Sequence, residues 1–527
     1  MTTQVRPVGD DALLVTLDTA EAAVALHRSL RERPVPGVGP TVPGARTLLV
    51  PFTPGRADPA RLARELRARV TEPASAGAAQ VRRHEIAVVY DGEDLAAAAE
   101  LLGWSVDELV RRHAAATWRV AFMGFAPGFG YLSGDDPALE LPRRSSPRTR
   151  VPVGAVAMAG GYSGVYPRES PGGWQLLGRT DAVVWDVARE APALWAPGDA
   201  VRFRPARELV TMSRPAASAP PSTPSPADPV LEVVSPGLQT LVQDLGRPGS
   251  VDLGVSASGA ADPRSARAAQ RAVGNRTDAA ALETLGGLRL RALRTVVVAV
   301  TGAPADLEVV SDDAPPRVPP LGRPFVLGAG QELSLRSPRR GLRTYVAVRG
   351  GLDVAPVLGS RSADLLAGLG PAALATGDVL GAAPDDVGAV ATADPGAPDP
   401  DRLPAPGEVV TLPVVPGPRA DWFPADALAL LTSQEWEVTP RSDRIGLRLH
   451  GERPLTRTAA AWDAELPSEA AVTGAFQVPP DGQPVLFGPD HPLTGGYPVI
   501  ATVAASHRWL LGQVPPGARI RCRLVEA

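Results

Sequence analysis

Apolar and polar positions in the first 80 residues follow two different periods. Residues 12–17 and 47–52 are short apolar runs, which is the pattern of buried strands. Residues 21–30 and 58–70 instead carry Ala and Leu at helical spacing. This alternation of strand and helix predicts a small α/β lobe over residues 1–80.

Residues 81–210 predict a second unit that is mostly strand. A strand at 84–90 precedes two short helices at 94–102 and 105–115, and glycine and proline then recur every few residues between Tyr, Trp, Phe and Val. Long helices do not survive that spacing, because glycine loosens and proline breaks the hydrogen-bond ladder. Short strands joined by tight turns do survive it.

A turn followed by an alternating strand recurs along the chain, as in the stretch WAPGDAVRFRP. Its four copies lie at 197–204, 328–336, 376–382 and 515–524. Such repetition indicates repeated β-barrel units, each finished by a similar strand. A second echo links residues 151–167 and 478–498, because each places Val-Pro ahead of Gly-Gly-Tyr.

Residues 211–229 have no periodicity and are rich in Pro, Ser and Ala, which predicts a semi-extended linker between two large halves. The second half begins with strand patterns and a helix at 262–273 that Gly274 ends. A loop region rich in Ala, Pro, Gly and Asp then separates two predicted subdomains, residues 230–390 and 400–527.

Composition narrows the classes of function. The chain has 527 residues, a formal net charge of −4 and a pI near 6.0, which gives no reason to expect a nucleic-acid partner. All 53 basic residues are arginine, so a biotinylated lysine, a Schiff base and a Walker-type phosphate loop are excluded. Cys522 is the only cysteine, which excludes a disulfide or a cysteine-based zinc site within one chain.

The N-terminal residues lack the basic and apolar regions of a signal peptide, and no apolar stretch approaches the ~20 residues that a membrane span needs. We therefore expect a cytoplasmic protein without membrane contact. The six histidines are scattered without short spacing, so the sequence offers no metal site.

A cationic run lies in the middle of the first half. Its arginines are Arg143, Arg144, Arg148 and Arg150, framed by Pro142, Pro147 and Pro152. A loop that is stiffened by prolines and holds several guanidiniums suits a carboxylate or a phosphate. The alternative is a solvated loop whose arginines aid solubility.

The motifs around this run resemble a known pair of domains. GFAPGFGYL, PRRSSPRTRVPVGAVAMAGGYSGVYP and SPGGWQLLGRT resemble the first domain of allophanate-hydrolase-type and 5-oxoprolinase subunits, a family related to urea amidolyase. GVSASGAAD, SDRIGLRLHG and GAFQVPPDGQPVLFGPDHPLTGGYP resemble the second domain of the same pair. The resemblance covers residues 1–210 and 230–527 and implies two usually separate subunits fused in one chain. It implies a mixed α+β fold, mainly β, of cyclophilin-like β-barrel domains with an N-terminal α/β lobe.

The resemblance implies a component of an ATP-dependent 5-oxoprolinase, which opens 5-oxoproline to glutamate together with a LamB/YcsF-type subunit on another chain. ATP would act with magnesium, and biotin cannot be attached to this chain because it has no lysine. One alternative is a carboxyltransferase that passes carbon dioxide from carboxybiotin on another chain to urea or a related amide. Another is a regulatory protein that binds a histidine kinase. A homo-oligomer stays open at this point.

The resemblance and the charge pattern together suggest two anion-binding walls and a polar cleft. The first wall would consist of Arg143, Arg148, Arg150 and Arg179, and the second of Arg419, Arg441 and Arg444. The cleft would be completed by His113, Asp490, Thr494, Gly495, Gly496 and Tyr497. Taken singly, each of these residues also suits a turn, a helix cap or a structural ion pair.

Two positions depart from the family pattern. Relatives tend to carry polar residues after the aspartate at 490, where this chain has Pro492 and Leu493. Contacts of those polar side chains cannot be carried over, which leaves the substrate specificity open.

Asp244 and Arg247 are close enough in sequence to predict a structural ion pair around a turn. The sequence points to no residue as the catalytic base.

Overall fold

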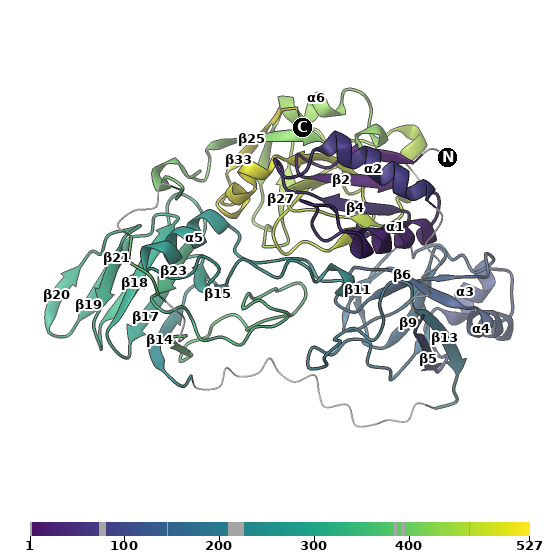
Figure 1. Cartoon of the computed structure of the whole chain (residues 1–527), viewed down its shortest axis with the longest axis horizontal. Helices are drawn as coiled ribbons and strands as arrows, with labels where there is room; N and C mark the ends of the chain where they lie inside the picture. Colours follow the sequence, from purple (N-terminus) through teal and green to yellow (C-terminus); the bar gives the residue numbers. More distant parts are fainter. Residues whose placement is uncertain are drawn as a thin grey trace.

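The computed structural model describes residues 3–72, 81–144, 146–208, 226–383, 387–391, 396–462 and 464–526. Four units follow one another along the chain, and strands outnumber helices in them. In Figure 1 the third unit lies at the left, the second at the lower right, and the first sits against the fourth at the top. The predicted mixed fold, mainly β with barrels and an N-terminal α/β lobe, is confirmed.

The first unit is the predicted α/β lobe. Its four-stranded sheet has the order β1 (Gln4–Pro7), β2 (Ala12–Thr16), β4 (Thr47–Pro51), β3 (Val42–Pro43). One face carries α1 (Ala20–Glu32) and α2 (Pro59–Thr71). The side chains of Thr19 and Asp58 accept backbone N–H groups at the starts of these helices, which satisfies donors that a helix leaves unpaired.

The second unit is a barrel of seven strands. In sequence order they are β5 (Arg83–Val88), β6 (Trp118–Met123), β7 (Gly130–Gly134), β9 (Ala155–Ala159), β10 (Tyr162–Val165), β12 (Gln175–Arg179) and β13 (Ala200–Pro205). A bridge between Val89 and Arg179, with two backbone hydrogen bonds of 2.9 Å, brings the two ends of this sheet together. The unit also contains α3 (Leu95–Leu101), α4 (Val106–Ala115) and a small sheet of β8 (Arg148–Val151) with β11 (Ser170–Gly172).

The third unit consists of two packed sheets with one shared core. The six-stranded sheet has the order β20 (Ala314–Arg317), β19 (Leu307–Ser311), β22 (Glu332–Leu335), β17 (Leu288–Ala292), β14 (Pro229–Pro236), β24 (Val379–Gly381). The five-stranded sheet has the order β15 (Thr240–Gln243), β16 (Ala281–Thr284), β23 (Thr344–Val348), β18 (Val296–Gly302), β21 (Pro324–Leu327). α5 (Pro263–Ala272) packs on β18 and β23, and Gly274 with φ +76° follows its end as predicted.

The fourth unit is a closed barrel. In sequence order its strands are β25 (Val409–Pro416), β26 (Glu435–Val438), β27 (Gly446–His450), β29 (Ala475–Gln477), β30 (Val485–Phe487), β32 (Val499–Val503) and β33 (Arg519–Leu524). It also holds α6 (Ala427–Ser433), a short pair of β28 (Glu469–Ala470) with β31 (Thr494–Gly495), and 3-10 turns. The turns of the second half are η1 (Val251–Leu253), η2 (Pro400–Arg402), η3 (Ala420–Trp422), η4 (Ala459–Ala461) and η5 (Ala505–Gly512).

The two barrels share one topology. With the strands of each barrel numbered along the sequence, both follow the order 1-7-2-3-5-4-6, with the first and last strands parallel. In each, an indole on the second strand donates to a carbonyl five residues earlier, from Trp118 to His113 and from Trp436 to Leu431, both at 3.0 Å. The barrels are therefore structural repeats of one another.

The turn-and-strand repeats seen in the sequence coincide only in part with the equivalence of the two barrels. The copies at 197–204 and 515–524 each finish a barrel, whereas those at 328–336 and 376–382 lie in the two-sheet unit. The echo of Val-Pro with Gly-Gly-Tyr is misleading, because the first Gly-Gly-Tyr joins β9 to β10 and the second precedes β32. These strands are not equivalent in the two barrels.

The halves of the chain share a buried core. The face of the lobe sheet opposite α1 and α2 carries Val8, Leu14 and Leu49, which pack with Leu493 of the fourth unit. Arg508 adds a bidentate ion pair to Asp11, with N–O distances of 2.6 and 2.7 Å. Most of the predicted linker lies outside the described residues, while β14 begins at Pro229. Within the described ranges, no helix is long and apolar enough to cross a membrane.

Candidate functional site

Loops from three units meet at one junction. The loop after β6 contacts η1 of the third unit, where Gly128 N–H donates to the Leu253 carbonyl at 2.9 Å. The same loop lies against the fourth unit, because a side chain at Gly124 would collide with Thr494. These loops belong to GFAPGFGYL, GVSASGAAD with the residues before it, and the stretch ending in LTGGYP. Motifs far apart in sequence thus form one composite surface.

The backbone at this junction is strained. Among the residues that the structure describes, three non-glycine residues have positive φ: Phe125 at 65°, Ser258 at 53° and Leu358 at 52°. Phe125 lies in the loop after β6, and Ser258 donates to Asp490 of the fourth unit at 2.6 Å. Such conformations cost of order 1–3 kcal/mol each and cluster at functional sites. The junction is therefore the first place to look for chemistry.

Tyr131 is the polar centre of the junction on the side of the first barrel. Its ring stacks on Phe122 with a centroid distance of 4.2 Å. Burial raises the pKa of Tyr131, and the charge of Arg143 and the nearby polar groups of Ser468 and Thr494 oppose this shift. A tyrosine of the first half thus faces hydroxyl groups of the second half.

The arginines of the predicted first wall already have carboxylate partners. Arg148 forms hydrogen bonds of 2.7 and 2.8 Å to Asp94 and also reaches Glu93, and Arg144 shares Asp94. Burial alone would raise the pKa of Asp94, but hydrogen bonds from Arg148 and the Leu176 N–H outweigh it and lower the pKa.

The remaining members of that wall are more exposed. Arg179 pairs with Asp91 at 2.8 Å and Arg150 with Glu169 at 2.6 Å, with the guanidinium-bearing side chains 59% and 76% exposed. Arg143 reaches only Glu465, at 4.0 Å, and is the least neutralised of the set. The predicted anion wall therefore carries less free positive charge than the sequence suggests, because the acidic segment 91–94 pairs with Arg144, Arg148 and Arg179.

His113 is a core residue of the first barrel. It is fully buried, with Nδ1 2.7 Å from the Tyr90 hydroxyl and Nε2 3.0 Å from the Ser163 hydroxyl. Its ring stacks on Phe203 at 4.7 Å. Burial lowers the pKa of His113 to about 3, so the ring is neutral at physiological pH. The resemblance suggested a site residue, whereas the structure places the side chain in the core of the first barrel.

The predicted second wall separates into three places. Arg444 is buried between Asp490, at 2.8 and 2.9 Å, and Glu283, at 2.5 Å. Arg419 is paired with Glu469 and is nearly buried. Arg441 is exposed and lines a surface cleft of about 340 Å³ beside β27 and β30 of the fourth unit. These three arginines do not form one wall.

The Gly-Gly-Tyr segment serves the fold of the fourth unit. Gly495 is paired with Glu469 through β31 and β28, so its backbone is not free to approach a ligand. Gly495 and Tyr497 line a crevice of about 10 Å³, which has room for one water molecule. Gly496 precedes Tyr497, which is 45% exposed with the Arg457 guanidinium 5.9 Å from its ring centroid.

One of the two departures from the family pattern, Leu493, has a packing role. Leu493 is 5% exposed and packs into the core that joins the lobe sheet to the fourth unit. His491, just before Pro492, stacks on Phe487, and its Nδ1–H donates to the Pro492 carbonyl at 2.9 Å. An apolar residue at 493 therefore suits the contact between the fused halves.

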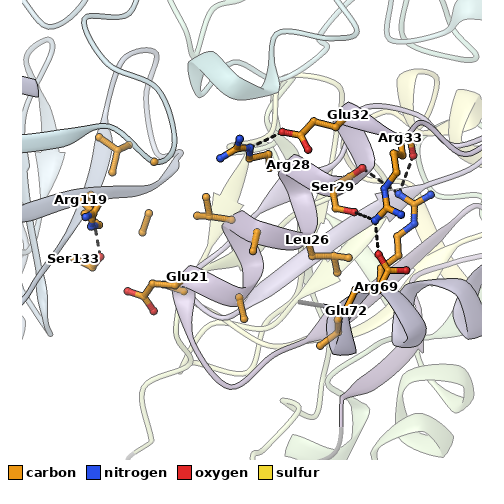
Figure 2. A pocket seen from close by; sticks show the side chains of 18 residues that line it. Glu21, Leu26, Arg28, Ser29, Glu32, Arg33, Arg69, Glu72, Arg119 and Ser133 are labelled. Carbon is orange, nitrogen blue, oxygen red and sulfur yellow. Dashed lines mark hydrogen bonds and ion pairs between the residues drawn. The ribbon is translucent and has the colours of Figure 1, made fainter. Parts of the chain in front are cut away.

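A larger cavity lies between the lobe and the first barrel. It measures about 630 Å³ and runs between α1 and strands β6 and β7 (Figure 2). Four of the helix-side charges pair with one another, Arg28 with Glu32 at 2.6 Å and Arg33 with Glu72 at 2.5 Å. Arg119 lies on the opposite wall beside Ser133. None of the site residues predicted from the sequence lines this cavity.

A buried charge cluster beneath the junction was not predicted from the sequence. Asp244 and Arg247 do not pair directly as predicted: Asp244 accepts from the Ser360 and Ser362 hydroxyls at 2.6 Å. Arg247 instead faces Asp364, with Nη1 and Oδ2 3.9 Å apart. The signal that could have pointed here is the long loop 349–378, which has no helix or strand of its own.

Family models match most of the chain. A model described as carboxyltransferase domain, subdomains C and D, matches residues 3–195, and one described as subdomains A and B matches residues 253–524. This chain belongs to the carboxyltransferase-domain family. In this family member, subdomains C and D precede subdomains A and B. The junction is formed in space by loops from both matched regions.

Curated relatives divide between the two halves of this carboxyltransferase-domain protein. The 5-oxoprolinase C subunit of Escherichia coli K12 is 35% identical over 310 residues, which cover 56% of this chain and 93% of that protein. The 5-oxoprolinase B subunit of Escherichia coli O157:H7 is 46% identical over 129 residues, or 24% of this chain and 59% of that protein. Urea amidolyase of Lachancea kluyveri is 33% identical over 308 residues, but these span only 16% of its length.

Solved structures show the same architecture. A crystal structure of TTHA0988 covers 99% of this chain and 100% of its own, with a TM-score of 0.82 and 36% identity. The Kluyveromyces lactis urea carboxylase matches with a TM-score of 0.51 and 29% identity, over 57% of this chain and 28% of that one. The fused arrangement therefore has a solved counterpart over its full length.

Proposed function

We propose that this chain is a component of an ATP-dependent 5-oxoprolinase, which opens 5-oxoproline to glutamate together with a LamB/YcsF-type subunit. The observation that carries the proposal is that one chain is similar to both the B and the C subunits of 5-oxoprolinase. The shared core and ion pairs between its halves support their acting as one body.

The chemistry of a lactam explains why such a protein would use ATP. The amide carbonyl of 5-oxoproline is a poor electrophile, and transfer of a phosphoryl group to its oxygen makes the carbon reactive toward water. Arg143 is the guanidinium at the junction with the weakest internal partner. In this proposal it holds the substrate carboxylate through a charge-assisted hydrogen bond worth ~1.5–3 kcal/mol.

Magnesium would bind together with ATP rather than at a metal site of the protein alone. Among the described residues, no group of three His, Cys, Asp or Glu side chains is placed to hold a metal ion. Magnesium commonly binds through substrate phosphates and waters with few protein ligands. The phosphates themselves would then be held by arginines and backbone amides, because the chain has no lysine.

A carboxyltransferase is the second candidate, favoured by the family models and the similarity to urea amidolyase. It would pass carbon dioxide from carboxybiotin on another chain to urea or a related amide. A regulatory protein that binds a histidine kinase is a third candidate, which the fusion disfavours. A permanently tethered pair of halves would leave little to regulate.

Substrate-dependent ADP release separates the first two candidates. The purified chain would be mixed with the LamB/YcsF-type subunit and ATP, with or without 5-oxoproline. We expect ADP release that requires both 5-oxoproline and this chain. Consumption of carboxybiotin in the presence of urea, without ADP release on 5-oxoproline, would instead establish the carboxyltransferase.

A further inference from the structure

The long loop 349–378 carries a carboxylate to the junction. The loop connects β23 to β24 and extends from the two-sheet unit toward the first barrel (Figure 1). At its tip, Arg168 of the first barrel donates a short hydrogen bond to the Leu366 carbonyl. Loops of this length without secondary structure are uncommon in compact proteins, where they serve as functional segments or as linkers. Asp364 lies two residues before this contact.

The two oxygens of Asp364 have different surroundings. Oδ1 accepts the Ala367 N–H at 2.8 Å. Oδ2 has no hydrogen-bond partner among the described residues, and neither does Nη1 of Arg247, 3.9 Å away. Both side chains are buried, at 1% and 0% exposure. A buried polar atom without a partner is costly, so two facing each other mark a place that a ligand or water completes.

The charges around Asp364 come from every unit that meets at the junction. They are Arg168 of the first barrel, Arg247 of the third unit, and Arg444 and Asp490 of the fourth. Burial, followed by the like charge of Asp490, raises the pKa of Asp364 to about 6, against the opposing effect of Arg247 and Arg444. At neutral pH the group is therefore an ionised carboxylate that readily accepts a proton.

We propose that Asp364 is the general base that removes the amide N–H proton of the substrate, with Oδ2 as the accepting atom. The proposal rests on the proposed function. As the lactam oxygen forms a bond to the γ-phosphorus of ATP, the bond from that phosphorus to ADP breaks. The N–H proton passes to Oδ2, and its electron pair forms a C=N bond in an O-phosphorylated imidate. Because Asp364 is 2% exposed, substrate entry requires the loop tip to move away from Arg168.

The same base serves the alternative reaction. When a urea nitrogen attacks the carboxyl carbon of carboxybiotin, a new N–C bond forms and the bond from that carbon to biotin breaks. The attacking nitrogen must again lose a proton, which Asp364 would take up, and the biotin nitrogen, which keeps the electron pair of the broken bond, is protonated in turn. The role of Asp364 can therefore be tested whichever amide is the substrate.

The test compares Asp364→Asn with Asp353→Asn in the full chain mixed with its partner subunit. Asp353 is an exposed carboxylate of the same loop, so it controls for charge. We expect Asp364→Asn to lower kcat at least ~100-fold, since general bases contribute that much or more. The wild-type pH–rate profile should rise through an apparent pKa near 6, as burial of Asp364 dictates, and the residual rate of the variant should lack that rise. Asp353→Asn should match the wild type.

Three outcomes would overturn the proposal. They are a kcat of Asp364→Asn within about threefold of the wild type, an unchanged pH limb, or a variant less stable than the wild type at pH 7, as a structural partner of Arg247 would be. If the wild type forms no glutamate, the proposed function fails, and the same variants are assayed with carboxybiotin and urea. If neither reaction runs, the stability of Asp364→Asn relative to the wild type at pH 7 is the remaining test, and a less stable variant overturns the proposal.

Discussion

Asp364→Asn should make the protein more stable at neutral pH, which is unusual for a buried charged residue. Burial and the neighbouring Asp490 raise the pKa of Asp364 from 3.8 to about 6. The folded state therefore holds its proton over a range in which the unfolded state has lost it. Ionisation of this group opposes folding, and an uncharged asparagine of nearly the same shape removes that opposition.

The size and sign of the effect follow from linkage. A pKa raised on folding contributes stability at low pH that is lost as pH rises from about 4 to about 6. The difference of about two units corresponds to about 3 kcal/mol at 1.36 kcal/mol per unit. We expect Asp364→Asn to equal the wild type in stability near pH 4 and to exceed it by about 3 kcal/mol above pH 7.

Urea unfolding at several pH values between 4 and 8 measures this difference, with Asp353→Asn as the control that removes an exposed carboxylate from the same loop. The reasoning is refuted if Asp364→Asn is destabilised above pH 7. That result would mean that attraction to Arg247 outweighs burial, and that the 3.9 Å gap is a structural ion pair.

Three further substitutions test the surroundings of the junction. Asp490→Asn should lower the free energy of unfolding in urea by about 3–5 kcal/mol, because it removes one charged partner of buried Arg444. A loss under about 1 kcal/mol would contradict a buried network of these charges. Arg148→Ala should lower stability by about 1–3 kcal/mol through Asp94 and leave the KM for 5-oxoproline unchanged; a raised KM at full stability would return Arg148 to the substrate site. Leu493→Gln should lower the free energy of unfolding by about 1–3 kcal/mol, because it buries a side-chain amide between the two halves. An unchanged stability would show that residue 493 is not tightly packed there.

Local features of the fold could be predicted from the sequence because their causes are local. Asp58, Ser105 and Asp262 accept N–H groups at the starts of their helices, and Gly274 follows the end of α5. The α/β lobe and the strand-and-turn character of the second unit were predicted on the same grounds. Periodicity within about ten residues carries this information.

The equivalence of the two barrels could not be read from the sequence in the same way. Trp118 and Trp436 occupy matching places, but the residues whose carbonyls they bind are His113 and Leu431, which share no chemistry. The contact uses a backbone carbonyl, so it requires no particular side chain at that position. Topology, not sequence similarity, identifies the repeat.

The arginines were over-interpreted for a related reason. A cationic run shows where guanidiniums lie in sequence, but their carboxylate partners come from distant segments, such as Asp94 for Arg148 and Glu469 for Arg419. Asp364 was missed because nothing local distinguishes it from other aspartates. Its environment comes from residues that only the folded chain brings together.

Glutamate formation from 5-oxoproline and ATP is the measurement that tests the proposed function most directly. The chain would be assayed alone, with the LamB/YcsF-type subunit, and with that subunit in the absence of ATP. We predict glutamate only when both proteins and ATP are present. Folded proteins that form no glutamate in the complete mixture would contradict the assignment to a 5-oxoprolinase and favour the carboxyltransferase.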